Sequence, residues 1–227
     1  MAWSCSASTN AGLVANLKKA GIFRSEAVEA ALLATDRAKY SPGSFYEDSP
    51  QYLGHDATIS APHMHCMCLE LLLGQLRPGS RVLDVGCGSG YLTATFSRMV
   101  GETGLVVGLD HLPELVELSR RNLTSDGVAL NGDGHSGSGV TLMERDGWAG
   151  APEHGLYDAI HVGAAAATVP SSLLEQLKEG GRMIIPVGPN GGDQSLLQID
   201  KSVEGDGRCT TTVVSGVRYV PLVRHDT

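Results

Sequence analysis

Apolar residues recur with a helical period near the start of the chain. Leu13 and Leu17 are spaced as on one face of a helix, and Gly21 is a residue at which helices typically stop. Ser25 stands where its hydroxyl can cap a second helix. Residues 10–40 are therefore predicted to form two short helices.

The helical period lapses from Tyr40 to Pro62, where Ser-Pro, Gly and Asp-Ser-Pro punctuate the chain. This pattern predicts a long loop, and such loops in compact domains are usually functional or disordered. The helical period resumes from His63 to Leu76 and predicts a further helix, which Pro78 and Gly79 end.

Beyond residue 80, short apolar runs that are typical of strands alternate with helical stretches. Such alternation predicts βαβ units, and hence an α/β fold with a doubly wound, mostly parallel sheet. Two late runs separated only by a Gly-Asp-Gly turn predict an antiparallel edge, which brings the expected sheet to seven strands. The expected strands are RVLDVG, LVVGLD, VTLME, LYDAIHVG, RMIIPVG, SLLQID and TTTVVSGVRYVPL, and helices are expected from Tyr91, Leu112 and Ser171.

The segment from Thr124 to Gly139 interrupts this alternation. It is rich in Gly, Ser, Asp and Asn and carries almost nothing to bury. A composition of this kind predicts a solvated, mobile surface loop between a helix and the third strand.

The composition narrows the class of protein. The 227 residues are 42% hydrophobic and 19% charged, which is an ordinary globular balance. The net charge of -8 would repel a phosphate backbone, so no nucleic-acid partner is expected. The chain has no run long enough to span a membrane and no signal-peptide pattern, and its five cysteines are sparse and odd in number. A soluble protein of the reducing cytoplasm, without membrane contact, is expected.

A glycine-rich turn joins the first predicted strand to its helix, in the run DVGCGSG from Asp84 to Gly90. Glycines there let a ligand approach the backbone at the switch point of an open α/β sheet. Asp110 ends the next strand about 20 residues on, where a carboxylate can bind ribose hydroxyls. Asp84 beside the loop would disfavour a pyrophosphate but not a cationic sulfonium, which favours S-adenosylmethionine as the cofactor.

Several other interpretations compete with this one. An NAD-dependent Rossmann oxidoreductase is the main alternative, although it prefers the spacing G-x-G-x-x-G. Asp84 and Asp110 can also be plain helix caps. His63, His65, Cys66 and Cys68 are metal-ligand types, but their spacing on a helix makes them diverge, and no metal is expected. No G-x-S-x-G elbow for a hydrolase is present, whereas a non-catalytic binding module stays open.

Seven short motifs, taken together, resemble the protein-L-isoaspartate (D-aspartate) O-methyltransferase family. The resemblance runs along nearly the whole chain. It implies a Rossmann-like class I methyltransferase fold with extra N-terminal helices, an altered order of the last strands, and a monomer. The motifs are MAW at residues 1–3, ATDR at 34–37, DSPQ at 48–51, ATISAPHMH at 57–65, YDAIHVGAAA at 157–166, PVGPNGG at 186–192 and GVRYVPL at 216–222.

The family's activity supplies the expected reaction. The resemblance implies methyl transfer from S-adenosylmethionine, leaving S-adenosylhomocysteine, to the α-carboxylate of L-isoaspartyl residues in damaged proteins. It implies less efficient transfer to the β-carboxylate of D-aspartyl residues, and the ester then collapses to a succinimide so that normal aspartate is restored. The expected partners are therefore peptides and proteins with isoaspartyl or D-aspartyl residues.

The resemblance also implies roles for individual positions. Ser60 resembles the family's catalytic hydroxyl, and Ser60, Val217, Tyr219 and Val220 resemble substrate contacts. The positions that resemble cofactor contacts are Ala57, Thr58, Ile59, Ser60, His65, Asp84, Gly86, Cys87, Gly88, Asp110, His111, Asp146 and Gly147.

A single methyltransferase domain is expected over residues 1–227. Within it, residues 1–62 are expected to hold the N-terminal helices and a substrate and cofactor loop, residues 63–200 the Rossmann-like core, and residues 201–227 the C-terminal strands.

The chemistry agrees with the residues near Ser60. A carboxylate with a reference pKa of about 3.5 is already ionised, so its methylation needs no strong base. No Asp or Glu lies beside Ser60 in the sequence to act as one. Ser60 is accordingly predicted to position the nucleophile rather than to attack.

Overall fold

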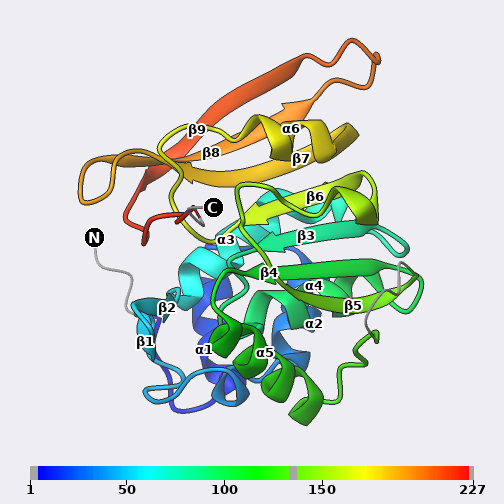
Figure 1. The fold of residues 1–227 in the computed structure, drawn as a ribbon. Helices are drawn as coiled ribbons and strands as arrows, with labels where there is room; N and C mark the ends of the chain where they lie inside the picture. The colour runs from blue at the N-terminus through cyan, green and yellow to red at the C-terminus, as the bar shows by residue number, and fades with distance from the viewer. Residues whose placement is uncertain (1–4, 133–136, 225–227) are drawn as a thin grey trace.

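A seven-stranded sheet organises the computed structural model, which describes residues 5–132 and 137–224. Its strand order is β5-β4-β3-β6-β7-β8-β9, parallel from β5 to β7 and antiparallel from β7 to β9 (Figure 1). The predicted α/β fold with a mostly parallel sheet is confirmed. The strands are β3 (Arg81–Val85), β4 (Leu105–Asp110), β5 (Gly139–Glu144), β6 (Tyr157–Val162), β7 (Leu177–Val187), β8 (Gln194–Lys201) and β9 (Cys209–Val217).

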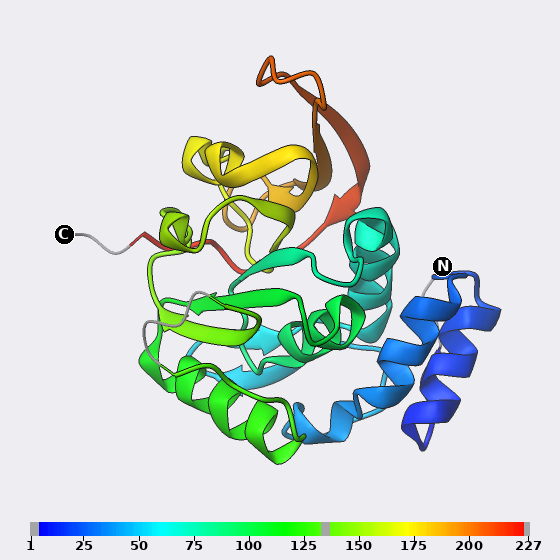
Figure 2. The same ribbon diagram turned by 90° about the vertical axis from the view of Figure 1, so that its right-hand side faces the viewer.

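Six helices accompany the sheet in the described residues, together with three 3-10 turns. Near the start of the chain, α2 packs against α3 and α4, and α1 packs against α2 (Figure 2), which agrees with the expected N-terminal helices. The helices are α1 (Asn10–Lys19), α2 (Glu26–Ala34), α3 (Pro62–Leu72), α4 (Tyr91–Val100), α5 (Pro113–Ser125) and α6 (Ser171–Gln176), and the turns are η1 (Arg37–Lys39), η2 (Leu73–Gln75) and η3 (Pro152–His154).

Two apolar cores lie on the two faces of the sheet. Alternate residues of β3 divide between them, with Val82 in the core that α1 to α5 share and Leu83 and Val85 in the core that α6 covers. Side chains of a strand point alternately to opposite faces, so a parallel sheet with both faces covered is apolar throughout. For this reason RVLDV and LVVGLD are mostly apolar and are buried along almost their whole length.

The loop predicted from Tyr40 to Pro62 contains a hairpin that the sequence pattern missed. Strands β1 (Gln51–Gly54) and β2 (Ala57–Ile59) pair antiparallel around a two-residue turn. The turn residues His55 and Asp56 have φ of 52° and 56°, a left-handed conformation that usually calls for Asn or Gly. Strands of four and three residues are also too short to show a period.

The helix ends are partly as predicted. Gly21, with φ of 75°, follows the end of α1, and Ser25 is the residue before α2. The Ser25 hydroxyl does not cap α2, because it donates to Glu70 of α3 at 2.7 Å instead. The predicted helix from His63 to Leu76 is α3 followed by the tighter turn η2.

The prediction of a solvated loop over residues 124–139 is wrong at its beginning. Thr124 and Ser125 complete α5, and the Asp126 side chain is 3% exposed. Val128 and Leu130 pack against the core, and Leu130 bridges to Val140. The composition did not predict this, because only a few of the described residues, Asp126, Val128 and Leu130, attach the segment to the core. Residues 133–136 of the segment, like the MAW motif, lie outside the described residues.

No helix within residues 5–132 and 137–224 is long and apolar enough to cross a membrane.

Candidate active site

The glycine-rich turn lies between β3 and α4, as predicted. Gly86 and Gly88 have φ of 75° and 55°, where a side chain would strain the backbone. The amides of Gly86 and Cys87 both donate to the Leu109 carbonyl at 2.8 Å, which ties the turn to the end of β4. The carboxyl ends of the two strands therefore form one wall.

A cleft of about 340 Å³ opens at these strand ends. The β1–β2 hairpin, the glycine turn, the end of β4 and residues 220–223 near the C-terminus line it. Eight of the predicted site residues belong to its wall, namely Ala57, Thr58, Gly86, Gly88, Asp110, His111, Gly147 and Val220.

Asp110 combines a structural contact with a position on the cleft wall. Its Oδ2 accepts from the Gly88 amide at 3.0 Å, and its Oδ1 accepts from the Leu112 amide at 3.3 Å. Burial raises the pKa of Asp110, whereas these backbone donors act in the opposite direction. Neither contact caps α5, whose N-cap is Leu112 and which has no side-chain cap hydrogen bond, so the alternative of a plain helix cap is wrong for Asp110.

A second, smaller cavity of about 30 Å³ adjoins the cleft. The two share the wall residues Thr58, Gly86, Gly88 and Gly163, so they lie side by side at the glycine turn. The predicted residues in the wall of this inner cavity, besides the shared ones, are Ile59, Ser60, His65, Asp84 and Cys87.

Asp84 is buried in the inner cavity and is paired with His161, which sequence reasoning missed. The Nδ1 of His161 lies 2.9 Å from Asp84 Oδ1, and the Thr93 hydroxyl donates to Oδ2 at 2.6 Å. Burial by itself would lower the pKa of His161, but hydrogen bonds with Asp84 and Cys68 raise it to about 10. His161 lies within the YDAIHVGAAA motif, and this motif is the sequence feature that could have marked it as a site residue.

His65 is a buried, uncharged neighbour of Ser60. Burial, together with the nearby Arg37 guanidinium, lowers the pKa of His65 well below its usual range. Its ring lies 5.1 Å from that of Tyr91, another residue of the cavity wall that was not predicted. A neutral imidazole here can donate one hydrogen bond without adding charge.

Ser60 follows β2 and is held through its backbone, because Arg37 Nη2 donates to the Ser60 carbonyl at 2.9 Å. The Tyr219 hydroxyl interacts with the Ser60 side chain and the Cys68 thiol. Burial and the contact with Cys68 raise the pKa of Tyr219 well above its usual range. In the described part of the inner cavity wall, Asp84 is the one carboxylate, and its hydrogen bonds go to other side chains.

Three predicted residues are absent from both cavity walls, namely Asp146, Val217 and Tyr219, although the Tyr219 hydroxyl interacts with the Ser60 side chain. The Asp146 carboxylate accepts from the Trp148 amide at 2.8 Å, and its neighbours Arg145 and Gly147 line the cleft in its place. Val217 ends β9 and packs against the core, whereas Tyr219 and Val220 beyond it reach the site.

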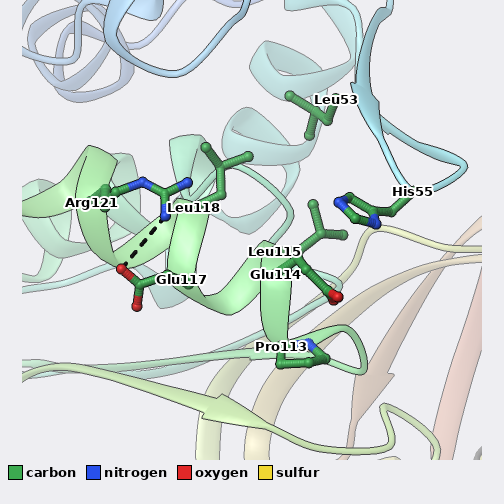
Figure 3. A pocket seen from close by; sticks show the side chains of 8 residues that line it. All are labelled: Leu53, His55, Pro113, Glu114, Leu115, Glu117, Leu118 and Arg121. Carbon is green, nitrogen blue, oxygen red and sulfur yellow. Dashed lines mark ion pairs between the residues drawn. The ribbon is translucent and has the colours of Figure 1, made fainter.

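A shallow groove of about 580 Å³ lies beside the cleft, between the hairpin and α5 (Figure 3). It shares His55 and Leu115 with the cleft, and Glu117 pairs with Arg121 along its floor at 3.6 Å. No sequence pattern indicates a site there. Over the described residues, no cluster of three or more His, Cys, Asp or Glu side chains is placed to hold a metal ion.

The cleft fits a nucleoside. Leu109, Leu112 and Leu115 offer apolar walls, and Asp110 offers a carboxylate for hydroxyl groups. Arg145, the one Arg or Lys of the described wall, is paired with Glu153 at 2.7 Å, so it is not free for a pyrophosphate.

Comparison with known proteins identifies the relatives of this chain. The family model described as protein-L-isoaspartate(D-aspartate) O-methyltransferase matches residues 8–227. A protein-L-isoaspartate O-methyltransferase of Caenorhabditis elegans is 44% identical over 100% of this chain and 97% of its own length. One of Triticum aestivum is 50% identical over 94% of this chain and 90% of its own.

Solved structures agree with the sequence relatives. The chain resembles a Plasmodium falciparum protein-L-isoaspartate O-methyltransferase that was crystallised with S-adenosyl-L-homocysteine. The TM-score is 0.85 at 33% identity, over 96% of this chain and 100% of that one. None of these relatives supports the alternative of an NAD-dependent oxidoreductase.

Proposed function

The chain belongs to the protein-L-isoaspartate(D-aspartate) O-methyltransferase family, and from that membership we propose how its residues divide the work of methyl transfer. It is an S-adenosylmethionine-dependent methyltransferase of isoaspartate repair. The observation that carries the residue assignment is that the cleft, which has Asp110 in its wall, adjoins a small cavity that has Ser60 in its wall.

The acceptor is the α-carboxylate of an L-isoaspartyl residue and, less efficiently, the β-carboxylate of a D-aspartyl residue. A carboxylate is ionised at neutral pH, so the enzyme needs no general base for its attack. The described wall of the inner cavity agrees with this, because Asp84 lies there within a pair with His161. Alignment and exclusion of water are then the main contributions of the protein.

When bound, S-adenosylmethionine supplies an electrophilic methyl group on a cationic sulfur. Asp110 is assigned to the ribose hydroxyls, and His111 and Gly147 to the adenine side of the cleft. Gly86 and Gly88 leave room beside the backbone for the rest of the cofactor. The remaining cofactor assignments are Ala57, Thr58, Ile59, Ser60, His65, Asp84 and Cys87, and Asp146 is retained only as the residue that shapes the turn before Trp148.

Ser60 is assigned to the acceptor carboxylate. Its hydroxyl donates to one carboxylate oxygen and so leaves the other aligned with the methyl group. Tyr219, whose hydroxyl interacts with Ser60, and Val220, on the cleft wall, border the acceptor peptide. Val217 is assigned a supporting role under that border, because it packs against the core.

The enzyme is further proposed to act as one monomeric domain in the cytoplasm, without nucleic-acid or membrane partners. All five cysteines are free thiols, which suits a reducing compartment. The net charge of -8 disfavours binding to nucleic acid.

The test of this function uses a pair of peptides that differ only in one linkage. An isoaspartyl peptide and its normal aspartyl twin are incubated with labelled S-adenosylmethionine. Labelled methyl ester is expected on the isoaspartyl peptide and not on its twin, with S-adenosylhomocysteine formed in equal amount. Equal labelling of the two peptides would contradict the substrate assignment.

A further inference from the structure

Arg37 is a fully buried arginine directly behind Ser60. Its side chain is 0% exposed, and its Nη2 donates to the Ser60 carbonyl at 2.9 Å. Its Nη1 lies 3.4 Å from His65 Nδ1, and its Cζ lies 5.5 Å from the ring centre of Tyr91. All three neighbours belong to the wall of the inner cavity.

The charge of Arg37 has no ion-pair partner among the described residues. By contrast, Arg98 pairs with Asp126 and Arg182 pairs with Asp200, each at 2.6 Å. The Arg37 Nε is buried and donates to no acceptor in the part of the chain described here. Burial lowers the pKa of Arg37, and the attraction of Tyr91, Asp48 and Cys66, none of which is in ion-pair contact, offsets only part of this effect. A guanidinium nevertheless stays protonated in proteins at neutral pH.

An unpaired buried charge is costly, and an opposite charge that enters an adjacent cavity reduces this cost. The neighbouring cavity admits such a charge, because the methyl acceptor is an anion. The contacts of Arg37 with the Ser60 carbonyl and with His65 place its positive charge next to the proposed carboxylate site.

We propose that Arg37 is a positioning residue that draws the acceptor carboxylate to Ser60 with a buried positive charge and holds the Ser60 backbone in place. The inference rests on the proposed role of Ser60. Methyl transfer neutralises both the carboxylate and the sulfonium, so the charge of Arg37 favours binding of the anionic peptide more than the transfer step.

The same charge acts on the cofactor, which provides a readout without turnover. S-adenosylmethionine carries a positive sulfur and S-adenosylhomocysteine a neutral one, although the two are otherwise alike. A positive charge nearby therefore weakens the first ligand relative to the second. The ratio of their dissociation constants measures the charge that Arg37 places at the site.

The experiment compares Arg37→Gln, which loses the charge but keeps N–H donors for the Ser60 carbonyl, with Arg37→Lys, which keeps the charge. For Arg37→Gln, the KM for isoaspartyl peptide should rise roughly tenfold with a smaller change in kcat. The ratio of Kd for S-adenosylmethionine to Kd for S-adenosylhomocysteine, from calorimetry, should fall several-fold. Arg37→Lys should retain the wild-type ratio within about twofold.

Arg182→Met is the matched control, because it removes an ion-paired arginine elsewhere in the sheet and should leave the ratio unchanged. A failure of the Ser60 assignment appears in the turnover of Ser60→Ala, whereas a failure of the Arg37 proposal appears in the ratio measured with Arg37→Gln.

An unchanged ratio in a folded Arg37→Gln or Arg37→Met variant would overturn the proposal. If neither neutral variant folds, Arg37→Lys decides. A kcat/KM within about tenfold of wild type supports a role of charge, and a folded Lys variant that loses more than about 100-fold contradicts it.

Discussion

At the scale of single residues, the side chains in the inner cavity wall are of two kinds. Some are hydrogen-bonded to other side chains, and others remain available to a ligand. Both oxygens of Asp84 are engaged, by Thr93 and by His161. The pair of Asp84 with a charged His161 fixes the wall next to Ser60 without providing a base. On the proposed role of Ser60, reactivity then comes from the position in which its hydroxyl holds the acceptor.

Ser60→Ala should lower turnover on isoaspartyl peptide by on the order of 100-fold, because a nucleophile misplaced by about 1 Å loses alignment with the methyl group. Folding should be intact, since removal of one oxygen opens no large cavity and Arg37 still holds the residue-60 carbonyl. The measurement is kcat at saturating cofactor, together with the melting temperature. Ser60→Thr retains a hydroxyl and should keep more activity than Ser60→Ala.

A wild-type rate in Ser60→Ala would exclude the positioning role. A loss of stability without a loss of rate would instead show that Ser60 is an ordinary loop residue.

Asp110→Ala should weaken S-adenosylmethionine binding by about 1.5–3 kcal/mol, the contribution of a hydrogen bond to a charged group. The variant also loses the acceptor for the Gly88 amide, so part of the effect arises from the glycine turn. Asp110→Asn keeps one carbonyl oxygen for Gly88 and should lose less affinity. Calorimetric titration with the cofactor separates the two variants, and unchanged affinity in both would remove Asp110 from the cofactor site.

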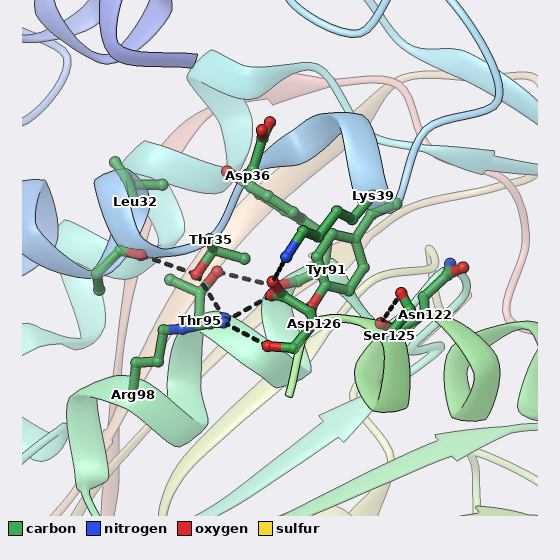
Figure 4. A network of polar contacts seen from close by, with 12 residues as sticks. Leu32, Thr35, Asp36, Lys39, Tyr91, Thr95, Arg98, Asn122, Ser125 and Asp126 are labelled. Atoms are coloured by element: carbon green, nitrogen blue, oxygen red, sulfur yellow. Dashed lines mark hydrogen bonds and ion pairs between the residues drawn. The ribbon is translucent and has the colours of Figure 1, made fainter. Parts of the chain in front are cut away.

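At the scale of elements, one carboxylate joins three parts of the fold that are far apart in the sequence (Figure 4). Asp126, just after α5, accepts from Lys39 and Tyr40 at the end of η1 and from Arg98 of α4, each at 2.6 Å. Arg98 also donates to Thr35 at 2.9 Å, directly after α2. The N-terminal helices that carry Arg37 toward the site are thereby fastened to the core.

Asp126→Ala should reduce the free energy of unfolding by about 1–2 kcal/mol, a value discounted because Lys39 is 45% exposed and solvent screens that pair. Burial would raise the pKa of Asp126, but hydrogen bonds from Lys39, Tyr40 and Arg98 lower it overall. A lowered folded-state pKa gives stability that is present above the unfolded pKa of about 3.9 and is lost as the pH falls through the folded value.

Urea titrations of wild type and Asp126→Ala from pH 7 to pH 3 check this prediction. The difference between the two should shrink toward the acid end. Asp206→Ala, which removes an exposed carboxylate paired with Arg208, is the control and should leave the unfolding midpoint unchanged. A difference that stays constant with pH would show that the Asp126 charge is not responsible.

At the scale of the whole molecule, the site is assembled from both ends of the chain. The hairpin near residue 55 and the segment at residues 220–223 form opposite parts of the cleft wall. That segment is attached to the loop after β6, where Ala165 exchanges backbone hydrogen bonds with Val220 and Leu222 at 2.8 Å. Trp148 adds a hydrogen bond to the Leu222 carbonyl at 2.9 Å and stacks under Arg224.

The enzyme should be monomeric in solution. A net charge of -8 opposes association of like chains, most strongly at low salt. Light scattering after gel filtration should give the mass of one chain at micromolar concentration, at both low and physiological salt. A dimer that appears only at high salt would point to β9, an edge strand that pairs with β8 alone among the described strands and exposes 65% of Val213.

The sequence by itself determined the strand and helix alternation, the glycine turn and the ends of β3 and β4. These features are local, because the periods of apolar residues and the conformational freedom of Gly86 and Gly88 act within a few residues. The motif ATISAPHMH pointed to Ser60, and the spacing after the glycine turn pointed to Asp110; both residues lie in cavity walls, and their roles stay predictions. Asp146 and Val217 were also predicted by resemblance, but Arg145 and Gly147 line the cleft beside Asp146, and Val220 lines it beyond Val217.

Only the tertiary structure decided which side chains meet across the fold. Asp84 and His161 are 77 positions apart, and Tyr40 and Asp126 are 86 apart, yet each pair shares a hydrogen bond. The unpaired state of Arg37 depends in the same way on where every described carboxylate lies. The burial of a side chain and the partner it meets depend on the whole packed chain rather than on one segment. For that reason no local sequence pattern predicts them.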